Sequence, residues 1–245
     1  MLGLTSITFR KLSRAEIAQL VRRAGLDGIE WGGDVHVPPG DTAAAEEARR
    51  LTTEAGLQSL SYGSYYRLNA GGDFDPVLES AHALGVPMIR VWAGEKGSSA
   101  ADEVYYEAAA KDLAAICEKA ARHHIRIGLE YHRNTLTDTR ASAAKLLDLA
   151  GCENLTTYWQ PNPDLTLAER LAEIESLCPR ISTIHVFNWT DGNVRHPLKE
   201  AADTWKLYID ALGPDARDYL IEFVKDDDPE AFLADAQALR DFFTS

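Results

Sequence analysis

Long apolar runs are missing from this 245-residue sequence. A helix that spans a bilayer needs about 20 consecutive, mostly apolar residues, and no stretch reaches that length. We therefore expect no membrane association. The start of the chain, MLGLTSITFRKLS, places its charges after the apolar residues, which is the reverse of a secretory signal. These two features predict a cytoplasmic protein.

Cysteine and positive charge are also scarce. Cys117, Cys152 and Cys178 are unevenly spaced, so we interpret them as small buried or helix-end residues and not as a disulfide framework, and a reducing compartment fits them. The net charge is -13, from 38 acidic and 25 basic residues, with no run of Lys or Arg. Nucleic acid is therefore not an expected partner. An anionic substrate would have to be held by individual arginines.

Glycine-rich phosphate-binding signatures are absent as well. No dinucleotide fingerprint or P-loop follows any β-rich run, and Gly32-Gly33 has the spacing of a turn. The β-rich runs alternate instead with helical patterns, and eight such runs are present: 4–9, 28–31, 58–62, 88–92, 126–130, 155–160, 182–187 and 219–224. Eight strand–helix units in one domain, residues 1–245, predict an α/β fold of the closed (β/α)₈ TIM barrel type.

The helical patterns have recognisable ends. Ser13 with Glu16, and Thr166 with Glu169, form capping boxes at two helix starts. Two acid–proline pairs mark further starts, Asp75-Pro76 and Asp228-Pro229. Glycines stand where helix ends are expected, at positions 25, 56, 85, 151 and 213.

A polar residue recurs where four apolar runs stop. Glu130 closes IRIGLE, Gln160 closes NLTTYWQ, ISTIHVF carries His185, and YLIEFV carries Glu222. The carboxyl ends of barrel strands share one face, so these four side chains are expected to converge. For any one of them, an ion pair or a hydrogen-bonded core residue would be an equally good explanation. Together they predict a site for one divalent metal: Mn²⁺, Mg²⁺ or Co²⁺, with Zn²⁺ also compatible.

On these residues the chain resembles the xylose isomerase-like barrel superfamily, in particular the sugar phosphate isomerase/epimerase group with its ketose 3-epimerases. The resemblance covers essentially the whole chain. It implies metal ligation by Glu130, Gln160, His185 and Glu222, and catalysis by Glu130 and Glu222 as an acid/base pair. It also implies that Arg195, in the segment after His185, contacts substrate. The chain departs from the group's pattern at two positions, where Gln160 replaces an Asp and Pro163 replaces a frequent second His.

Other residues near the strand ends are candidates for substrate binding. Aromatic faces at an open barrel end suit sugar rings, and Trp31, Trp92 and Tyr62 lie there, although each could instead pack under a loop. Four further candidates are His132, Asn134, Arg90 and His36. For Arg90 an ion pair with a strand glutamate is at least as good an interpretation, and for His36 a solvated loop position is the better one.

The leading functional hypothesis is a metal-dependent sugar isomerase or epimerase of carbohydrate metabolism. A glutamate would remove a proton beside a metal-bound carbonyl to form an enediolate. The alternative is a lyase or dehydratase acting on a keto-sugar, a sugar acid or a glycoside, because the same enediolate expels a β-leaving group. Cleavage of abasic DNA and a catalytically inactive sugar-binding barrel are weaker alternatives. The expected partner is a small carbohydrate. The sequence is also compatible with a homo-oligomer.

Overall fold

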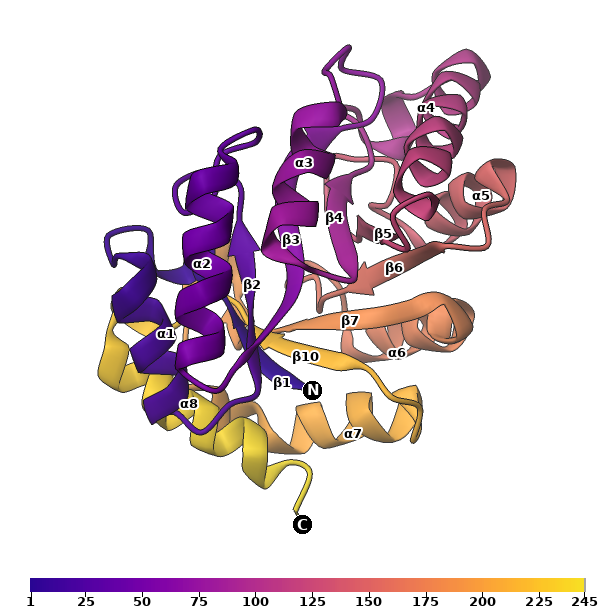
Figure 1. Cartoon of the computed structure of the whole chain (residues 1–245). Coiled ribbons are helices and arrows are strands. Elements are labelled where there is room, and N and C mark those ends of the chain that lie inside the picture. The colour runs from indigo at the N-terminus through magenta and orange to yellow at the C-terminus, as the bar shows by residue number, and fades with distance from the viewer. Residues whose placement is uncertain (245) are drawn as a thin grey trace.

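Eight parallel strands close into a barrel in the computed structural model, which describes residues 1–244 (Figure 1). In their order around the barrel the strands are β1 (Leu2–Thr5), β10 (Asp218–Ile221), β7 (Ile181–Val186), β6 (Leu155–Trp159), β5 (Arg126–Glu130), β4 (Met88–Trp92), β3 (Gln58–Arg67) and β2 (Gly28–Gly32). The barrel closes where β1 pairs with both β10 and β2. The predicted (β/α)₈ fold is confirmed.

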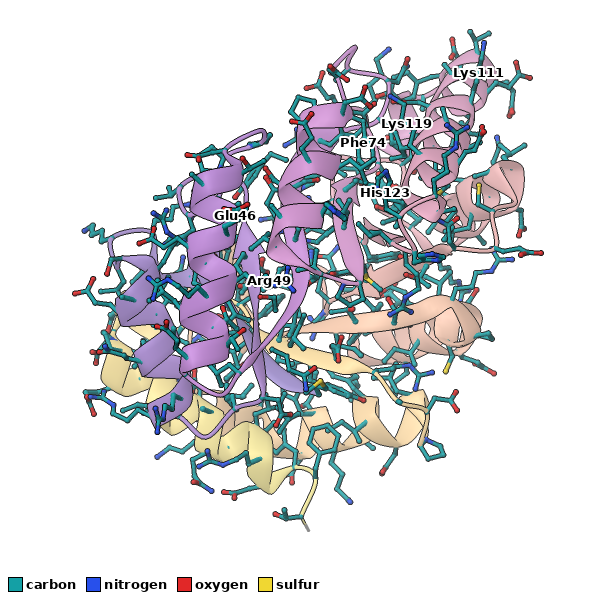
Figure 2. All side chains as sticks on the ribbon, in the orientation of Figure 1. Glu46, Arg49, Phe74, Lys111, Lys119 and His123 are labelled. Carbon is teal, nitrogen blue, oxygen red and sulfur yellow. The ribbon has the colours of Figure 1, made fainter. Side chains whose placement is uncertain are left out.

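Among residues 1–244, eight α-helices surround the strands. They are α1 (Arg14–Arg23), α2 (Thr42–Glu54), α3 (Asp75–Leu84), α4 (Glu103–Ala121), α5 (Arg140–Ala150), α6 (Leu167–Leu177), α7 (Ala202–Leu212) and α8 (Pro229–Asp241). Their apolar faces pack on the strands. Figure 2 shows polar side chains such as Glu46 and Lys111 on the outside of this ring. None of the helices in residues 1–244 has the length and apolarity that a membrane span requires.

Helix starts follow the local sequence closely. Both predicted capping boxes form, at Ser13 with Glu16 and at Thr166 with Glu169. Asp228 caps α8 as predicted, because its side chain accepts a hydrogen bond from the backbone of Glu230. Asp75 does not cap α3: it is the first helical residue, and Phe74 holds the cap position without a side-chain hydrogen bond.

The first strand differs from its predicted bounds of residues 4–9. It ends at Thr5, and the segment Ser6–Phe9 forms a 3₁₀ turn, η1, at the barrel mouth. The turn is buried and its side chains bond across it, since the hydroxyls of Thr5 and Thr8 lie 3.2 Å apart. The apolar run 4–9 is therefore longer than the strand, and its second half turns at the end of the barrel instead of continuing β1.

One element was not expected from the sequence. After β7 the chain forms a small antiparallel hairpin of β8 (Trp189–Thr190) and β9 (Val194–Arg195). Gly192 at its tip has a φ of +74°. The hairpin belongs to the same end of the barrel as the carboxyl ends of the strands, where barrel enzymes hold their active sites.

Candidate active site

The four predicted ligands come from four adjacent strands. Glu130 is the last residue of β5, Gln160 follows β6 directly, His185 lies within β7, and Glu222 follows β10 directly. Glu130, His185 and Glu222 are all buried. Within the described residues, one ligand atom from each of these three lies within 4.8 Å of the other two. The structure therefore brings the four side chains together.

The ring nitrogen Nδ1 of His185 faces three oxygens. It lies 3.2 Å from Gln160 Oε1, 3.4 Å from Glu222 Oε2 and 3.8 Å from Glu130 Oε1. Atoms that share one small divalent ion at about 2.0–2.2 Å are separated by distances of this kind. The set offers one nitrogen and three oxygens around a common centre.

The amide of Gln160 has a defined orientation. Its Nε2 donates a hydrogen bond of 2.8 Å to the backbone carbonyl of Tyr131, and this contact leaves Oε1 as the atom that faces His185. An amide can bind a metal only through oxygen. Gln160 thus turns its amide oxygen toward His185.

A buried ion-pair network supports the ligands from inside the barrel. Arg90 on β4 bonds to Glu130 Oε2 through one nitrogen and to Glu30 Oε1 through Nε, at 3.0 Å. The expected ion pair between Arg90 and a strand glutamate is therefore confirmed. Glu30, in the middle of β2, was missed by the sequence reasoning. It carries the signal used for Glu130, because it is the only polar side chain in the buried run GIEWG.

Burial controls the protonation of the clustered side chains. It lowers the pKa of His185 to about 3, and the positive charge of Arg90 adds to this effect. It raises the pKa of Glu222 to about 8, and the charge of Glu130 adds to that shift. His185 is therefore neutral at pH 7 and able to donate a lone pair. Within residues 1–244 the side chain near Glu222 is the neutral His185 and no Lys or Arg is bonded to it, so the charged form of Glu222 lacks a partner.

These residues fit a divalent cation. Two carboxylates, one amide oxygen and one neutral imidazole form a donor set typical of Mn²⁺, Mg²⁺ or Co²⁺. A cation would also compensate the Glu222 carboxylate, which burial otherwise disfavours. His185 Nε2 is a buried nitrogen that has no hydrogen-bond partner within residues 1–244.

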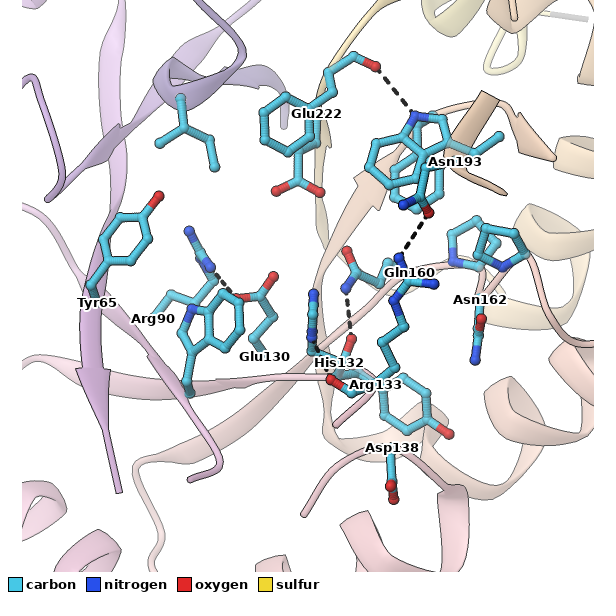
Figure 3. A pocket seen from close by; sticks show the side chains of 18 of the residues that line it. Tyr65, Arg90, Glu130, His132, Arg133, Asp138, Gln160, Asn162, Asn193 and Glu222 are labelled. Carbon is cyan, nitrogen blue, oxygen red and sulfur yellow. Dashed lines mark hydrogen bonds and ion pairs between the residues drawn. The ribbon is translucent and has the colours of Figure 1, made fainter. Parts of the chain in front are cut away.

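A cavity of about 230 Å³ opens above the ligands (Figure 3). Figure 3 shows the carboxylate of Glu222 pointing toward the space beside Glu130 and Gln160, with His132 next to them. The remaining lining residues are Ile7, Arg10, Tyr65, Arg90, Trp92, Tyr131, Arg133, Asp138, Pro161, Asn162, Pro163, Phe187, Trp189, Asn193 and Phe223. The lining thus combines aromatic rings with charged and amide side chains.

Three of the eight predicted substrate-binding residues line this cavity: Trp92, Arg90 and His132. Trp92 and His132 form one wall together, with ring centroids 4.5 Å apart. The hydrogen bond of His132 fixes its tautomer, because Nδ1 lies 2.7 Å from the backbone carbonyl of Arg133 and only an N–H can donate to a carbonyl. Nε2 then carries the lone pair.

Trp31, Tyr62 and His36 do not line the cavity. Trp31 is fully buried and donates to Thr52 Oγ1, while Tyr62 donates to the backbone carbonyl of Val37. His36 is 2% exposed and bonds to Ser6, so the interpretation as a solvated loop residue was wrong. Trp31 on β2 and Tyr62 on β3 face the surrounding helices and loops because alternate residues of a barrel strand point outward.

Arg195 and Asn134 also lie outside the cavity lining. Arg195 pairs with Asp227 at 2.5 Å and its guanidinium lies 4.9 Å from the ring centroid of Phe223, so it supports the wall instead of facing the cavity. Asn134 is exposed, with a φ of +62° that suits a turn. Besides Arg90, two arginines line the cavity, Arg10 and Arg133, and both come from loops whose course the sequence did not indicate.

Known proteins resemble both the sequence and the fold. Residues 18–196 match the family described as xylose isomerase-like TIM barrel. A 3-dehydroshikimate dehydratase of Bacillus anthracis is 26% identical over 211 residues, which cover 79% of this chain and 74% of the relative.

Solved structures agree on the fold. A probable 3-DHS dehydratase involved in petrobactin synthesis, from Bacillus anthracis, superimposes with a TM-score of 0.82 at 20% identity and covers 98% of both chains. A 3-keto-D-glucoside 4-epimerase from E. coli gives 0.72 at 14% identity, over 100% of this chain and 99% of its own.

Proposed function

Because the chain belongs to the xylose isomerase-like TIM barrel family, we propose that it is a metal-dependent lyase that removes water from a cyclic β-hydroxy ketone. 3-Dehydroshikimate is the candidate substrate. The observation that carries this proposal is the 26% identity, over most of both chains, to a 3-dehydroshikimate dehydratase. It favours the lyase alternative of the sequence analysis over the leading isomerase hypothesis.

The cavity suits this substrate class. Its volume of about 230 Å³ is below the range of drug-sized pockets and fits a single ring. 3-Dehydroshikimate has a ketone, two hydroxyls and a carboxylate on one ring. Trp92 and Trp189 offer flat walls for the ring, and Arg10 and Arg133 are the lining cations for the carboxylate.

Glu130, Gln160, His185 and Glu222 would hold the metal. When bound, the metal would act as a Lewis acid toward a substrate ketone. Both oxygens of Glu130 are then engaged, since Oε2 already bonds to Arg90 and Oε1 faces the ligand set. That leaves Glu130 without an oxygen for proton transfer, so we assign the proton transfer to another residue.

His132 is the residue we assign as the base. Its Nε2 carries a lone pair beside the ligands, and the Arg133 carbonyl would stabilise the imidazolium by accepting from Nδ1. In the proposed reaction His132 removes the proton from the carbon next to the ketone. The electron pair of that C–H bond forms a double bond to the neighbouring carbon, which loses its hydroxyl. His132 returns the proton to the departing hydroxyl, and water leaves. The resulting dienone becomes aromatic when a proton of the ring CH₂ group is lost and the ketone oxygen gains one.

The test is a direct assay. Purified protein with Mn²⁺ and 3-dehydroshikimate should generate the ultraviolet absorbance of an aromatic product, and chelation should abolish it. In parallel, D-fructose and D-psicose are incubated with the enzyme in D₂O. Deuterium incorporation into either sugar, without turnover of 3-dehydroshikimate, would support the isomerase hypothesis and refute the lyase.

The assignment of His132 has its own variant. His132→Asn should lower kcat at least about a hundredfold while the affinity for Mn²⁺ stays within a few-fold, because His132 is not in the ligand set. His82→Asn, on the outer face of α3, is the matched control and should keep full activity. If His132→Asn turned over at the native rate, another residue would be the base.

A further inference from the structure

Glu30 is the most completely enclosed carboxylate of the barrel interior. It lies on β2, outside the ligand set, and is 1% exposed. A buried carboxylate is costly unless its oxygens are bonded. Oε2 accepts hydrogen bonds from Ser61 Oγ at 2.7 Å and from the Tyr158 hydroxyl at 2.9 Å.

The other oxygen of Glu30 faces the metal site. Oε1 accepts from Arg90 Nε at 3.0 Å and lies 3.9 Å from His185 Nε2. Arg90 in turn holds Glu130. Through Oε1, Glu30 therefore reaches two of the four ligands: it adjoins His185 directly and is connected to Glu130 through a guanidinium.

The backbone makes room for this arrangement. A Cβ at Gly63 on β3 would lie 2.7 Å from both Glu30 Oε1 and a terminal nitrogen of Arg90. No side chain can be placed there without displacing the ion pair. The pairing of β2 with β3 also shifts register between Ile29 and Glu30. Local backbone structure thus provides the space for Glu30.

His185 needs a partner on its far side. Its Nδ1 faces the three ligand oxygens and must offer a lone pair, so its proton belongs on Nε2. Within the described chain Nε2 has no hydrogen-bond partner. Glu30 Oε1 faces it, and an approach of about 1 Å would complete the bond.

We propose that Glu30 is a positioning residue for the metal site. It fixes the tautomer of His185 that exposes Nδ1, and it holds Arg90 so that Glu130 is fixed in turn. The inference rests on the metal site of the proposed function, but not on the identity of the substrate. Carboxylates behind a ligating histidine commonly orient the ring and raise metal affinity.

Calorimetric titration with Mn²⁺ tests the proposal. Glu30→Gln keeps the size of the side chain but offers one acceptor oxygen in place of two. Its NH₂ group would face hydrogen-bond donors, to which it cannot bond. We expect the Kd for Mn²⁺ to rise 10- to 100-fold. Asp235→Asn is the matched control, because Asp235 is a buried acid on α8 that bonds to the backbone of Leu198. Its Kd should equal that of the native protein.

The tautomer of His185 is a second readout. It would not change if Glu30 only stabilised the fold. Nitrogen NMR of the Mg²⁺-loaded protein should show His185 protonated at Nε2, with the signal assigned by its loss in His185→Gln. In Glu30→Gln the amide can donate to Nε2, so the Nδ1–H tautomer should appear. An unchanged Kd together with an unchanged tautomer would overturn the proposal.

A second variant covers the case in which Glu30→Gln does not fold. Tyr158→Phe removes only the hydroxyl that bonds to Glu30 Oε2, and it should weaken Mn²⁺ binding several-fold. A native Kd in this variant would also contradict the proposal. These measurements use no substrate, so a negative dehydration assay would not bear on the role of Glu30. Conversely, an unchanged Kd in these variants would not bear on the proposed dehydratase activity.

Discussion

At the residue scale, the position that sets this site apart is 160, where an amide stands among two carboxylates and an imidazole. In the proposed metal site Gln160 would contribute an oxygen without charge, so the protein would supply two negative charges to a divalent ion. The ion is then held less tightly, and it should polarise a bound carbonyl more strongly. We therefore expect the amide at position 160 to lower the affinity for the metal and to make the bound metal a stronger Lewis acid.

Adding charge at residue 160 tests this argument. Gln160→Glu keeps the side-chain length and should bind Mn²⁺ more tightly, by something on the order of 1 kcal/mol, while turnover falls. Calorimetry and the dehydration assay provide the two measurements. Asn162→Asp adds the same charge to the same cavity from outside the ligand set. If it tightened Mn²⁺ binding equally, Gln160 would not be a ligand.

At the scale of single elements, local capping determines where several helices begin. In α6 the Thr166 side chain accepts from the backbone of Glu169, and the Glu169 side chain accepts from the backbone and hydroxyl of Thr166. Hydrogen bonding to Thr166 lowers the pKa of Glu169. These bonds satisfy backbone groups that would otherwise have no partner in the helix.

Removing this cap should destabilise the protein without changing the site. Thr166→Ala should lower the free energy of unfolding by about 1 kcal/mol, as measured by urea denaturation. Thr166→Ser retains the hydroxyl and is expected to remain near native stability. Equal losses in the two variants would mean that the hydroxyl does not stabilise α6.

The contact of α8 with the segment at Leu198 should depend on pH. Burial raises the pKa of Asp235 to about 6, above its ordinary value of 3.8. The folded protein thus favours the protonated carboxyl, and this contribution to stability is complete below pH 4 and lost as the pH rises toward 6. Thermal unfolding of native protein and Asp235→Asn between pH 4 and 7 measures it. The native protein should lose stability relative to the variant over pH 4–6, and parallel curves would contradict the shift.

At the scale of the whole molecule, the ligands come from β5, β6, β7 and β10, which span a large part of the sequence. Metal binding should therefore stabilise the barrel as a unit, because an unfolded chain does not gather these residues. The ion pair of Arg90 with Glu30 needs none of the four proposed ligands, and the apolar core surrounds the barrel, so the fold should persist without the ion.

Metal removal should consequently lower the Tm without unfolding the protein at room temperature. At a Mn²⁺ concentration one hundred times the Kd, the expected stabilisation is about 2.7 kcal/mol. Calorimetric melting with Mn²⁺ and with a chelator measures it. At the same Mn²⁺ concentration, the Glu222→Gln variant should show a smaller rise in Tm, since it loses a charged ligand and binds the metal more weakly. A Tm that does not respond to Mn²⁺ would exclude a native-state metal site.

The sequence by itself determined the barrel and the four polar side chains that converge at the ends of its strands. Alternating strand and helix patterns have a local physical cause, as do the caps at Ser13, Thr166 and Asp228, and the polar residues Glu130 and Glu222 stand out because burial of a lone carboxylate is costly. The family expected from these residues is the one whose model the chain matches. The leading hypothesis of an isomerase is less well supported than the lyase alternative, because the curated relative is a dehydratase. The sequence could not separate the two, since the same strand-end residues could serve isomerisation and dehydration.

Only the tertiary structure decided which side chains meet at the site. Glu30 and Arg90 lie 60 residues apart, and their ion pair depends on strand register and on the missing side chain of Gly63. Trp31, Tyr62 and His36 have the residue types of a binding site, but they pack elsewhere because strand alternation and loop course direct them away. Strand patterns arise from residues that are neighbours in the sequence. The cavity arises from contacts between loops that are distant in the sequence, and hydrophobic periodicity does not predict the course of a loop.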